Sequence, residues 1–269
     1  ARSCTYGLWL DRRGRVQADG FVLRTHDDGF HIFSYSCPAR AMVERLEAFI
    51  IADDVEVSDE TQEVGGISLV GEAAAAILGM RCDPPAPGEV AVMEEGFVFG
   101  GRRTHDASFE WVMAADRMPA VLTELREVGL RELTRGQIDR LRLDAGIPSV
   151  PDEIGPGDLP QEGGLQRDAV SFTKGCYLGQ EVMARLQATG RVRRRLAQVR
   201  VQGSVSLPAP LYREATQAGE LRSLIDGEGD GANGWALVKV GIECGDGLSF
   251  EPDGPVRLQV LGRTGEASR

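Results

Sequence analysis

The sequence predicts an α+β protein in two parts, with strands and helices mixed in the first part and strands alone in the second. The first third alternates between apolar runs of period two, typical of strands, and runs of period 3.6, typical of helices. Two further helical runs follow, and then a stretch rich in Pro, Gly and Asp at residues 148–168. From Leu196 onward the chain shows only short alternating runs separated by Gly and Pro, which indicate a small barrel or sandwich.

The N-terminal part has the element order of a ferredoxin-like unit, which we place at about residues 30–115. Helices are expected at 38–50, with Pro38 at the first helical position, and at 72–78, where Gly79 ends the helix. From residue 30 onward the order is strand-helix-strand-strand-helix-strand, the split βαβ signature. The strands are expected at 6–10, 16–24, 30–35, 55–57, 67–70, 89–93 and 97–100.

Two more helices and an irregular stretch lead to the C-terminal part. One helix is expected at 118–128 and another at 134–144, where Thr134 and Gln137 have the spacing of a capping box. Long irregular segments inside a compact chain, such as residues 148–168, are usually functional or mobile. We therefore place the domain boundary between residues 192 and 193, so that the second domain is 193–269. Its strands are expected at 197–201, 221–225, 235–240 and 256–260.

Composition narrows the class of protein. The hydrophobic fraction of 42% and the charged fraction of 26% are ordinary for a globular protein. No apolar run approaches the ~18–20 residues that span a bilayer, so we expect no membrane association and a cytoplasmic location. The five cysteines form no C-x-x-C pair and there are only three histidines, which predicts reduced thiols and no metal site. No P-loop or G-x-S-x-G elbow is present, and no G-x-G-x-x-G run joins a strand to a helix, which excludes nucleotide hydrolysis, dinucleotide redox and serine hydrolase chemistry.

Residues 174–181 carry the strongest functional signal. A neighbouring cation and a helix N-terminus both stabilise a thiolate and lower the thiol pKa from about 8.5. Lys174 supplies the cation, and it is one of only two lysines among 30 basic residues. Gly175 and Gly179 indicate unusual backbone angles or a close approach to something. Most lone cysteines are small packed hydrophobes, but these neighbours favour a reactive or ligand-facing thiol at Cys176.

The charge distribution of the chain favours small anions over nucleic acid as ligands. The formal net charge of −11 argues against a protein that coats nucleic acid, because such binding relies on phosphate neutralisation. A local basic cluster, Arg191 with Arg193 to Arg195, is either a solvated strand end or a site for carboxylates or phosphates.

Residues 174–181 and the segments around them resemble the YgfZ-type folate-binding proteins. These are relatives of the glycine-cleavage T-protein, which is an aminomethyltransferase. The matching residues are 170–181, Ala184-Arg185, Gly190 and 194–196, with further support from 143–148 and 219–223. The resemblance implies a ferredoxin-like, T-protein-like N-terminal region around a folate tunnel and a C-terminal β-barrel. It also implies tetrahydrofolate or a one-carbon derivative as cofactor, and a role in building or maintaining iron–sulfur enzymes with an indirect effect on tRNA thiomodification.

The resemblance also assigns roles to individual residues. Function in this family depends on the motif cysteine, here Cys176, which Lys174 would assist. Asp144 would hold the pterin ring, although relatives carry glutamate there. Asp19 would lie near the reactive folate nitrogens, although Ala18 replaces the first of two aspartates found in T-proteins. The expected cofactor-binding residues are Asp144, Asp19, Tyr177, Gln180, Glu181 and Arg191.

Three functions remain open from the sequence. The leading one is a tetrahydrofolate-binding accessory protein with iron–sulfur client enzymes as partners. A lone thiolate cannot hold a cluster of the usual four-cysteine kind, so any cluster contact of Cys176 would be shared or transient. The second is an aminomethyltransferase that moves a one-carbon unit to tetrahydrofolate. The third, direct tRNA binding through the arginine cluster, is disfavoured by the acidity of the chain, because folate carboxylates could use the same arginines.

Overall fold

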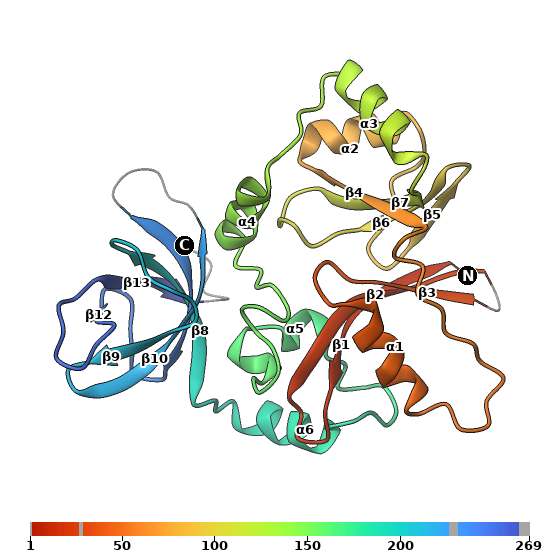
Figure 1. The fold of residues 1–269 in the computed structure, drawn as a ribbon. Helices are drawn as coiled ribbons and strands as arrows, with labels where there is room; N and C mark the ends of the chain where they lie inside the picture. The colour runs from red at the N-terminus through yellow and green to blue at the C-terminus, as the bar shows by residue number, and fades with distance from the viewer. Residues whose placement is uncertain (1, 27–28, 226–230, 264–269) are drawn as a thin grey trace. The chain divides into compact units, whose positions relative to one another are not determined.

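A computed structural model describes residues 2–26, 29–225 and 231–263, and Figure 1 shows the resulting mixture of sheets and helices. The chain divides into two units. The first takes in residues 1–7 and 20–138, and the second takes in residues 8–19 and 139–269. The α+β class predicted from the sequence is confirmed.

A four-stranded antiparallel sheet forms the centre of the first unit. Its order is β4-β7-β6-β5, and helices α2 and α3 cover one of its faces. Alternation along the strands turns Trp111 and Met113 of β7 toward the helices, where they pack with Leu78 and Leu125. The bounds are β4 Val64–Val70, α2 Glu72–Gly79, β5 Val90–Met93, β6 Gly96–Gly100, β7 Ser108–Ala114 and α3 Met118–Glu127.

The opposite face of this sheet is aromatic and packs against a second sheet, of order β1-β2-β3. Phe99 of β6 lies 5.0 Å from Phe21 of β2 and 5.6 Å from Phe33 of β3, measured between ring centroids. Large aromatic side chains bury much apolar surface, so this cluster contributes strongly to the stability of the unit. The bounds are β1 Ser3–Leu10, β2 Val16–His26, β3 Gly29–Phe33 and α1 Ala39–Glu47. Pro38 is the N-cap of α1 and not its first helical residue, so the helix begins at Ala39, one residue later than predicted.

The second unit contains the predicted C-terminal barrel-like sheet, of order β12-β13-β8-β11-β10-β9. A bridge between Tyr212 of β9 and Ser249, next to β12, joins the two ends of this sheet. Side chains such as Val199, Leu211 and Leu221 fill its interior. The bounds are β8 Arg194–Val201, β9 Ala209–Arg213, β10 Thr216–Ile225, β11 Ala232–Lys239, β12 Gly247–Leu248 and β13 Leu258–Arg263.

Helices and loops between residues 135 and 190 complete the second unit. The predicted capping box of α4 is confirmed: Gln137 N donates to Thr134 Oγ1 at 3.3 Å, and Thr134 N donates to Gln137 Oε1 at 2.9 Å. The predicted irregular stretch 148–168 contains only a short 3₁₀ turn and the start of one short helix. The bounds are α4 Arg135–Asp144, η1 Pro160–Glu162, α5 Gln166–Ala169 and α6 Gln180–Thr189.

Two predicted details of the element order in the first unit are wrong. Residues 55–57 form no strand, because Val55 and Val57 stand among acidic residues and are not alternating parts of a longer apolar run. Strand β7 was not predicted, because its central residues are buried on both faces of the strand and the apolar alternation is lost. The domain boundary at 192 and 193 stays a prediction: it falls directly before β8, whereas the second unit also contains residues 139–193.

Candidate functional site

The start of α6 lies directly against the turn between β1 and β2, and two glycines make this approach possible. Gly179 has a φ of 79°, and a Cβ there would lie 2.7 Å from Gly14 Cα and 2.8 Å from the Asp11 carbonyl oxygen. Gly14 has a φ of 71°, and a Cβ there would meet the end of Met183 at 2.7 Å. No L side chain fits at Gly179 without movement of the backbone. The sequence prediction of a special backbone is therefore confirmed at Gly179.

At Gly175 the described chain shows neither feature. Its φ is outside the left-handed region, and an added Cβ would meet no described atom within 4 Å. The two glycines of the motif thus differ: Gly179 is required by packing, whereas Gly175 stands in open space.

The turn that receives Gly179 is fixed by a single carboxylate. Asp11 Oδ1 accepts hydrogen bonds from Arg13 N at 2.8 Å and from Arg15 N at 2.9 Å. Gly14 N donates to the Asp11 carbonyl oxygen at 2.9 Å. A side chain that bonds its own turn in this way replaces backbone pairing and rigidifies the turn.

The loop before α6 is held by its own side chains and leaves Cys176 exposed. Ser171 Oγ accepts a hydrogen bond from Lys174 N at 3.1 Å, and Gln180 Oε1 accepts one from Tyr177 N at 3.1 Å. Lys174 Nζ lies 5.6 Å from the centroid of the Tyr177 ring, within cation–π range. Loss of solvation raises the pKa of Tyr177 above its usual 10.0.

Exposure separates Cys176 from most of the other cysteines. All five are free, and only Cys176 and Cys244 are exposed. Burial raises the pKa of Cys4 to about 11, and burial together with Asp83 raises the pKa of Cys82. Because the thiolate is the reactive form, these two thiols are poor nucleophiles. The Cys244 thiol donates to the Leu261 carbonyl oxygen at 2.9 Å.

The predicted site residues fall into one group and three separate positions. Cys176, Lys174, Tyr177, Gln180 and Glu181 lie together in the loop and the first turn of α6.

The other three predicted residues lie elsewhere in the second unit. Asp144, at the end of α4, is exposed and pairs with Arg140 at 3.0 Å. Asp19 is buried in β2, with 6% of its surface exposed. Arg191 is exposed beyond the end of α6.

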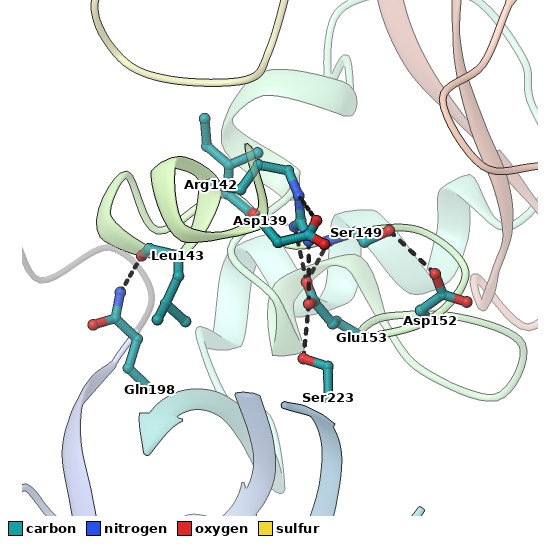
Figure 2. Close-up of polar contacts among 9 residues, drawn as sticks. Asp139, Arg142, Leu143, Ser149, Asp152, Glu153, Gln198 and Ser223 are labelled. Atoms are coloured by element: carbon teal, nitrogen blue, oxygen red, sulfur yellow. Dashed lines mark hydrogen bonds and ion pairs between the residues drawn. The ribbon is translucent and has the colours of Figure 1, made fainter. Parts of the chain in front are cut away.

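Sequence reasoning missed a buried polar cluster around Glu153 (Figure 2). Arg142 of α4 donates to Glu153 Oε2 at 3.1 Å and to Asp139 Oδ1 at 2.9 Å. Glu153 also accepts from Ser149 N at 2.6 Å and from Ser223 Oγ of β10 at 2.8 Å. The cluster ties α4 and the following segment to the barrel, and it holds Asp144 on the outer side of the helix. The only sequence signal was the Arg142-Leu143-Asp144 run, which pointed to Asp144 alone.

A second missed cluster surrounds Asp158 and Glu162. Arg194 of β8 donates to Asp158 Oδ1 at 3.0 Å and to Glu162 Oε2 at 2.9 Å, and Arg222 of β10 lies 3.3 Å from Asp158. Both carboxylates are buried. Arg194 is therefore engaged with protein carboxylates, which corrects the suggestion that it could receive folate. Acidic residues in a stretch rich in Pro and Gly gave no sequence signal of burial.

Metal binding and membrane spanning receive no support from the described parts of the chain. Among residues 2–26, 29–225 and 231–263, no group of three His, Cys, Asp or Glu side chains could hold a metal ion. No described helix is both long and apolar enough to cross a bilayer.

The fold and the site together define an α+β protein with a barrel-like C-terminal sheet and an exposed thiol before a helix. Comparison with known proteins makes the family explicit. The GCVT N-terminal domain matches residues 1–174, so the chain belongs to this family.

Known relatives share parts of the chain. The mouse iron–sulfur cluster assembly factor IBA57, mitochondrial, is 45% identical over 83 residues, which are 28% of this chain and 23% of that protein. The tRNA-modifying protein YgfZ of Edwardsiella ictaluri is 27% identical over 197 residues, 69% of this chain and 56% of that protein. The chain thus spans about half of the length of the YgfZ relative and less of IBA57.

A solved structure shares the fold. The glycine cleavage system aminomethyltransferase T from Bartonella henselae matches with a TM-score of 0.79 and 19% identity, covering 96% of this chain and 74% of that one. The predicted T-protein-like fold is confirmed.

Proposed function

We propose that this protein is a tetrahydrofolate-binding accessory factor for the assembly or maintenance of iron–sulfur enzymes, with Cys176 as its working thiol. Through such an enzyme it would affect tRNA thiomodification indirectly. The names of its relatives support the iron–sulfur role: one is an iron–sulfur cluster assembly factor and another a tRNA-modifying protein. The observation that carries the proposal is the exposed Cys176 on a loop that packing and hydrogen bonds hold in place.

The geometry of the loop suits a thiol that meets a partner. Two hydrogen bonds and the close approach of Gly179 hold the backbone on both sides of Cys176, so little conformational entropy is lost when a partner engages the sulfur. Lys174 places a cation two residues away, which favours contact with an anionic group. A single thiolate supplies one ligand, so a cluster touched by Cys176 would remain mainly on its client.

The residues proposed to bind folate carry groups that can hydrogen-bond to its pterin ring and to its carboxylates. A pterin ring presents hydrogen-bond donors that a carboxylate can accept, and the exposed Asp144 offers one. Folate glutamates are carboxylates, and the exposed Arg191 offers the matching fork of donors. When bound, tetrahydrofolate would supply nitrogens able to carry a one-carbon unit. Asp19, Tyr177, Gln180 and Glu181 complete the proposed binding residues.

The role of the thiol is tested by Cys176→Ser, with Cys244→Ser as control because it removes the other exposed thiol. Cells that lack their own copy of the gene would be complemented with each variant, and the activity of an iron–sulfur enzyme that modifies tRNA would be measured. We expect Cys176→Ser to fold with wild-type stability and to lose most of the complementing activity, while Cys244→Ser retains it. Full complementation by Cys176→Ser would refute the role of this thiol.

The enzymatic alternative is an aminomethyltransferase of the glycine-cleavage type. It would form methylenetetrahydrofolate from tetrahydrofolate and an aminomethyl-lipoyl partner, with release of ammonia and the reduced lipoyl thiol. The accessory function predicts no such product, and turnover in that assay would establish the alternative. A gel-shift titration at physiological salt would test direct tRNA binding, which we do not expect for a chain of net charge −11.

A further inference from the structure

The loop between β6 and β7, residues 101–107, holds two neighbouring arginines against two tyrosine rings. Arg102 Cζ lies 4.1 Å from the centroid of the Tyr6 ring, and Arg103 Cζ lies 3.6 Å from that of Tyr35. Stacking on an aromatic face fixes a guanidinium and lowers the entropy lost when it binds a further group. All of these residues belong to the first unit.

A buried carboxyl group lies beneath this loop. Glu110 of β7 is 1% exposed and accepts hydrogen bonds from Tyr35 OH at 2.6 Å and from Ser68 Oγ at 2.7 Å. Arg103 Nε donates to Ser68 Oγ at 3.1 Å and lies 4.0 Å from Glu110 Oε1. A Cβ at Gly101 would lie 2.5 Å from Glu110 Oε1, so only glycine lets the loop approach this closely.

The inner edge of the Arg103 guanidinium is engaged, but its outer edge is not. Nε faces Ser68 and Glu110, whereas Nη1 and Nη2 hydrogen-bond to no residue in the described parts of the chain. The side chain is nevertheless only 19% exposed. Two guanidinium donors held parallel are the geometry that binds carboxylate, phosphate and sulfate oxygens. In a chain of net charge −11, such a cation attracts anions locally and not through the overall field.

We propose that Arg103 forms a binding site for a small oxyanion at the outer edge of its guanidinium, and that occupancy of this site is coupled to protonation of Glu110. The ligand class is a carboxylate or a tetrahedral oxyanion such as phosphate or sulfate. The site lies wholly within the first unit and does not depend on the proposed function of the Cys176 loop.

The coupling follows from the groups that face Glu110. Burial raises its pKa to about 7, although the hydrogen bonds from Tyr35 and Ser68 and the charge of Arg103 act to lower it. On β6 the facing residue is Phe99, which contributes no charge. An anion on the outer edge of Arg103 offsets part of the positive charge felt by Glu110, so the neutral carboxyl is favoured. Near pH 7 anion binding is therefore accompanied by proton uptake, and affinity falls as pH rises.

Calorimetric titration of the full chain with sulfate and with glutarate tests both parts of the proposal. Neither probe changes its charge appreciably between pH 6.5 and 8, so the protein alone supplies any linked proton. We expect saturable binding with a Kd of about 1 mM or below for at least one probe. The observed binding enthalpy should differ between buffers that differ in ionisation enthalpy. The direction of this difference should be the one that proton uptake by the protein requires. The probe with the lower Kd shows whether the site prefers a tetrahedral oxyanion or a planar carboxylate.

Variants assign the site. Arg103→Gln should weaken binding about tenfold or more, and Arg103→Lys, which keeps the charge but loses the fork, should also weaken it. Arg40→Gln removes an exposed arginine of α1 and should change nothing. Glu110→Gln should retain binding but abolish the buffer dependence. Equal binding by wild type and both Arg103 variants would overturn the site, and binding by wild type without proton uptake would overturn the coupling.

Discussion

Gly179 holds the Cys176 loop against the β1–β2 turn through its lack of a side chain. The approach involves backbone atoms of Gly14 and Asp11, which cannot move aside as a flexible side chain would. The sequence predicted a special backbone at both motif glycines, because glycine is the residue of close approaches and left-handed turns. It could not separate the two, since the partner of Gly179 lies some 165 positions earlier in the chain and only folding brings them together.

Gly179→Ala should destabilise the protein by roughly 2–4 kcal/mol, because a left-handed φ costs an L residue about 1–2 kcal/mol and the backbone contact adds strain. Gly175→Ala is the matched control, two positions from Gly179 on a loop with open space, and should stay within about 1 kcal/mol of wild type. Denaturant unfolding measures both. Equal stability of the two variants would mean that Gly179 does not pack as described.

The carboxyl of Glu110 makes stability depend on pH. Its pKa is raised by burial from 4.5 to about 7, so the folded state binds this proton more tightly than the unfolded state. The resulting stability is fully present below pH 4.5 and is lost as pH rises toward 7, by about 3 kcal/mol in total. Glu110→Gln should remove this dependence, so the variant gains stability relative to wild type between pH 5 and pH 8. Parallel pH profiles for the two proteins would contradict the assignment.

Helix α4 and the segment after it are joined to the barrel by buried ion pairs. Figure 2 shows Arg142 directed at Glu153, and Glu153 in turn meets Ser223 of β10. The sequence predicted the helix, its capping box and the irregular segment correctly. It could not predict the pairing, because arginine and glutamate are usually exposed and nothing local distinguishes Arg142 from Arg140, two positions earlier.

Arg142→Gln should destabilise the protein by about 3–5 kcal/mol, because it leaves the Glu153 charge buried without its partner. Arg140→Gln breaks an exposed pair on the same helix and should cost at most about 1 kcal/mol. Thermal and denaturant unfolding of the two variants provides the comparison. A loss for Arg142→Gln as small as that for Arg140→Gln would show that the buried pair contributes little.

Strand prediction succeeded for several strands and failed for β7, for β9 and for residues 55–57. Strands β2, β4, β8 and β11 lie close to their predicted ranges. Strand β7 runs through the middle of the first unit, with Trp111 packed toward the helices and Val112 toward the aromatic cluster, so its sequence lacks a simple period. Residues 55–57 had two valines at the right spacing but no neighbouring apolar residues to sustain a strand.

For the molecule as a whole, the sequence predicted the fold class and the T-protein-like architecture, which the structural match confirms. It also predicted the cluster formed by Cys176, Lys174 and the first turn of α6. Asp19 and Asp144 were predicted from the resemblance alone, whereas Arg191 was also predicted from the basic cluster that it forms with Arg193 to Arg195. Carboxylates and arginines serve equally in ion pairs and in ligand sites, so their type and spacing do not decide between the two uses.

Binding of a reduced folate is the most direct test of the proposed function. Calorimetry of the purified protein with tetrahydrofolate suits this protein better than tryptophan fluorescence, because Trp111 and Trp235 are fully buried and only Trp9 is partly exposed. We predict saturable binding of one folate per chain at micromolar concentration, weakened by Asp144→Asn and Arg191→Gln. Absence of binding under reducing conditions, in protein shown to be folded, would contradict the folate-dependent function.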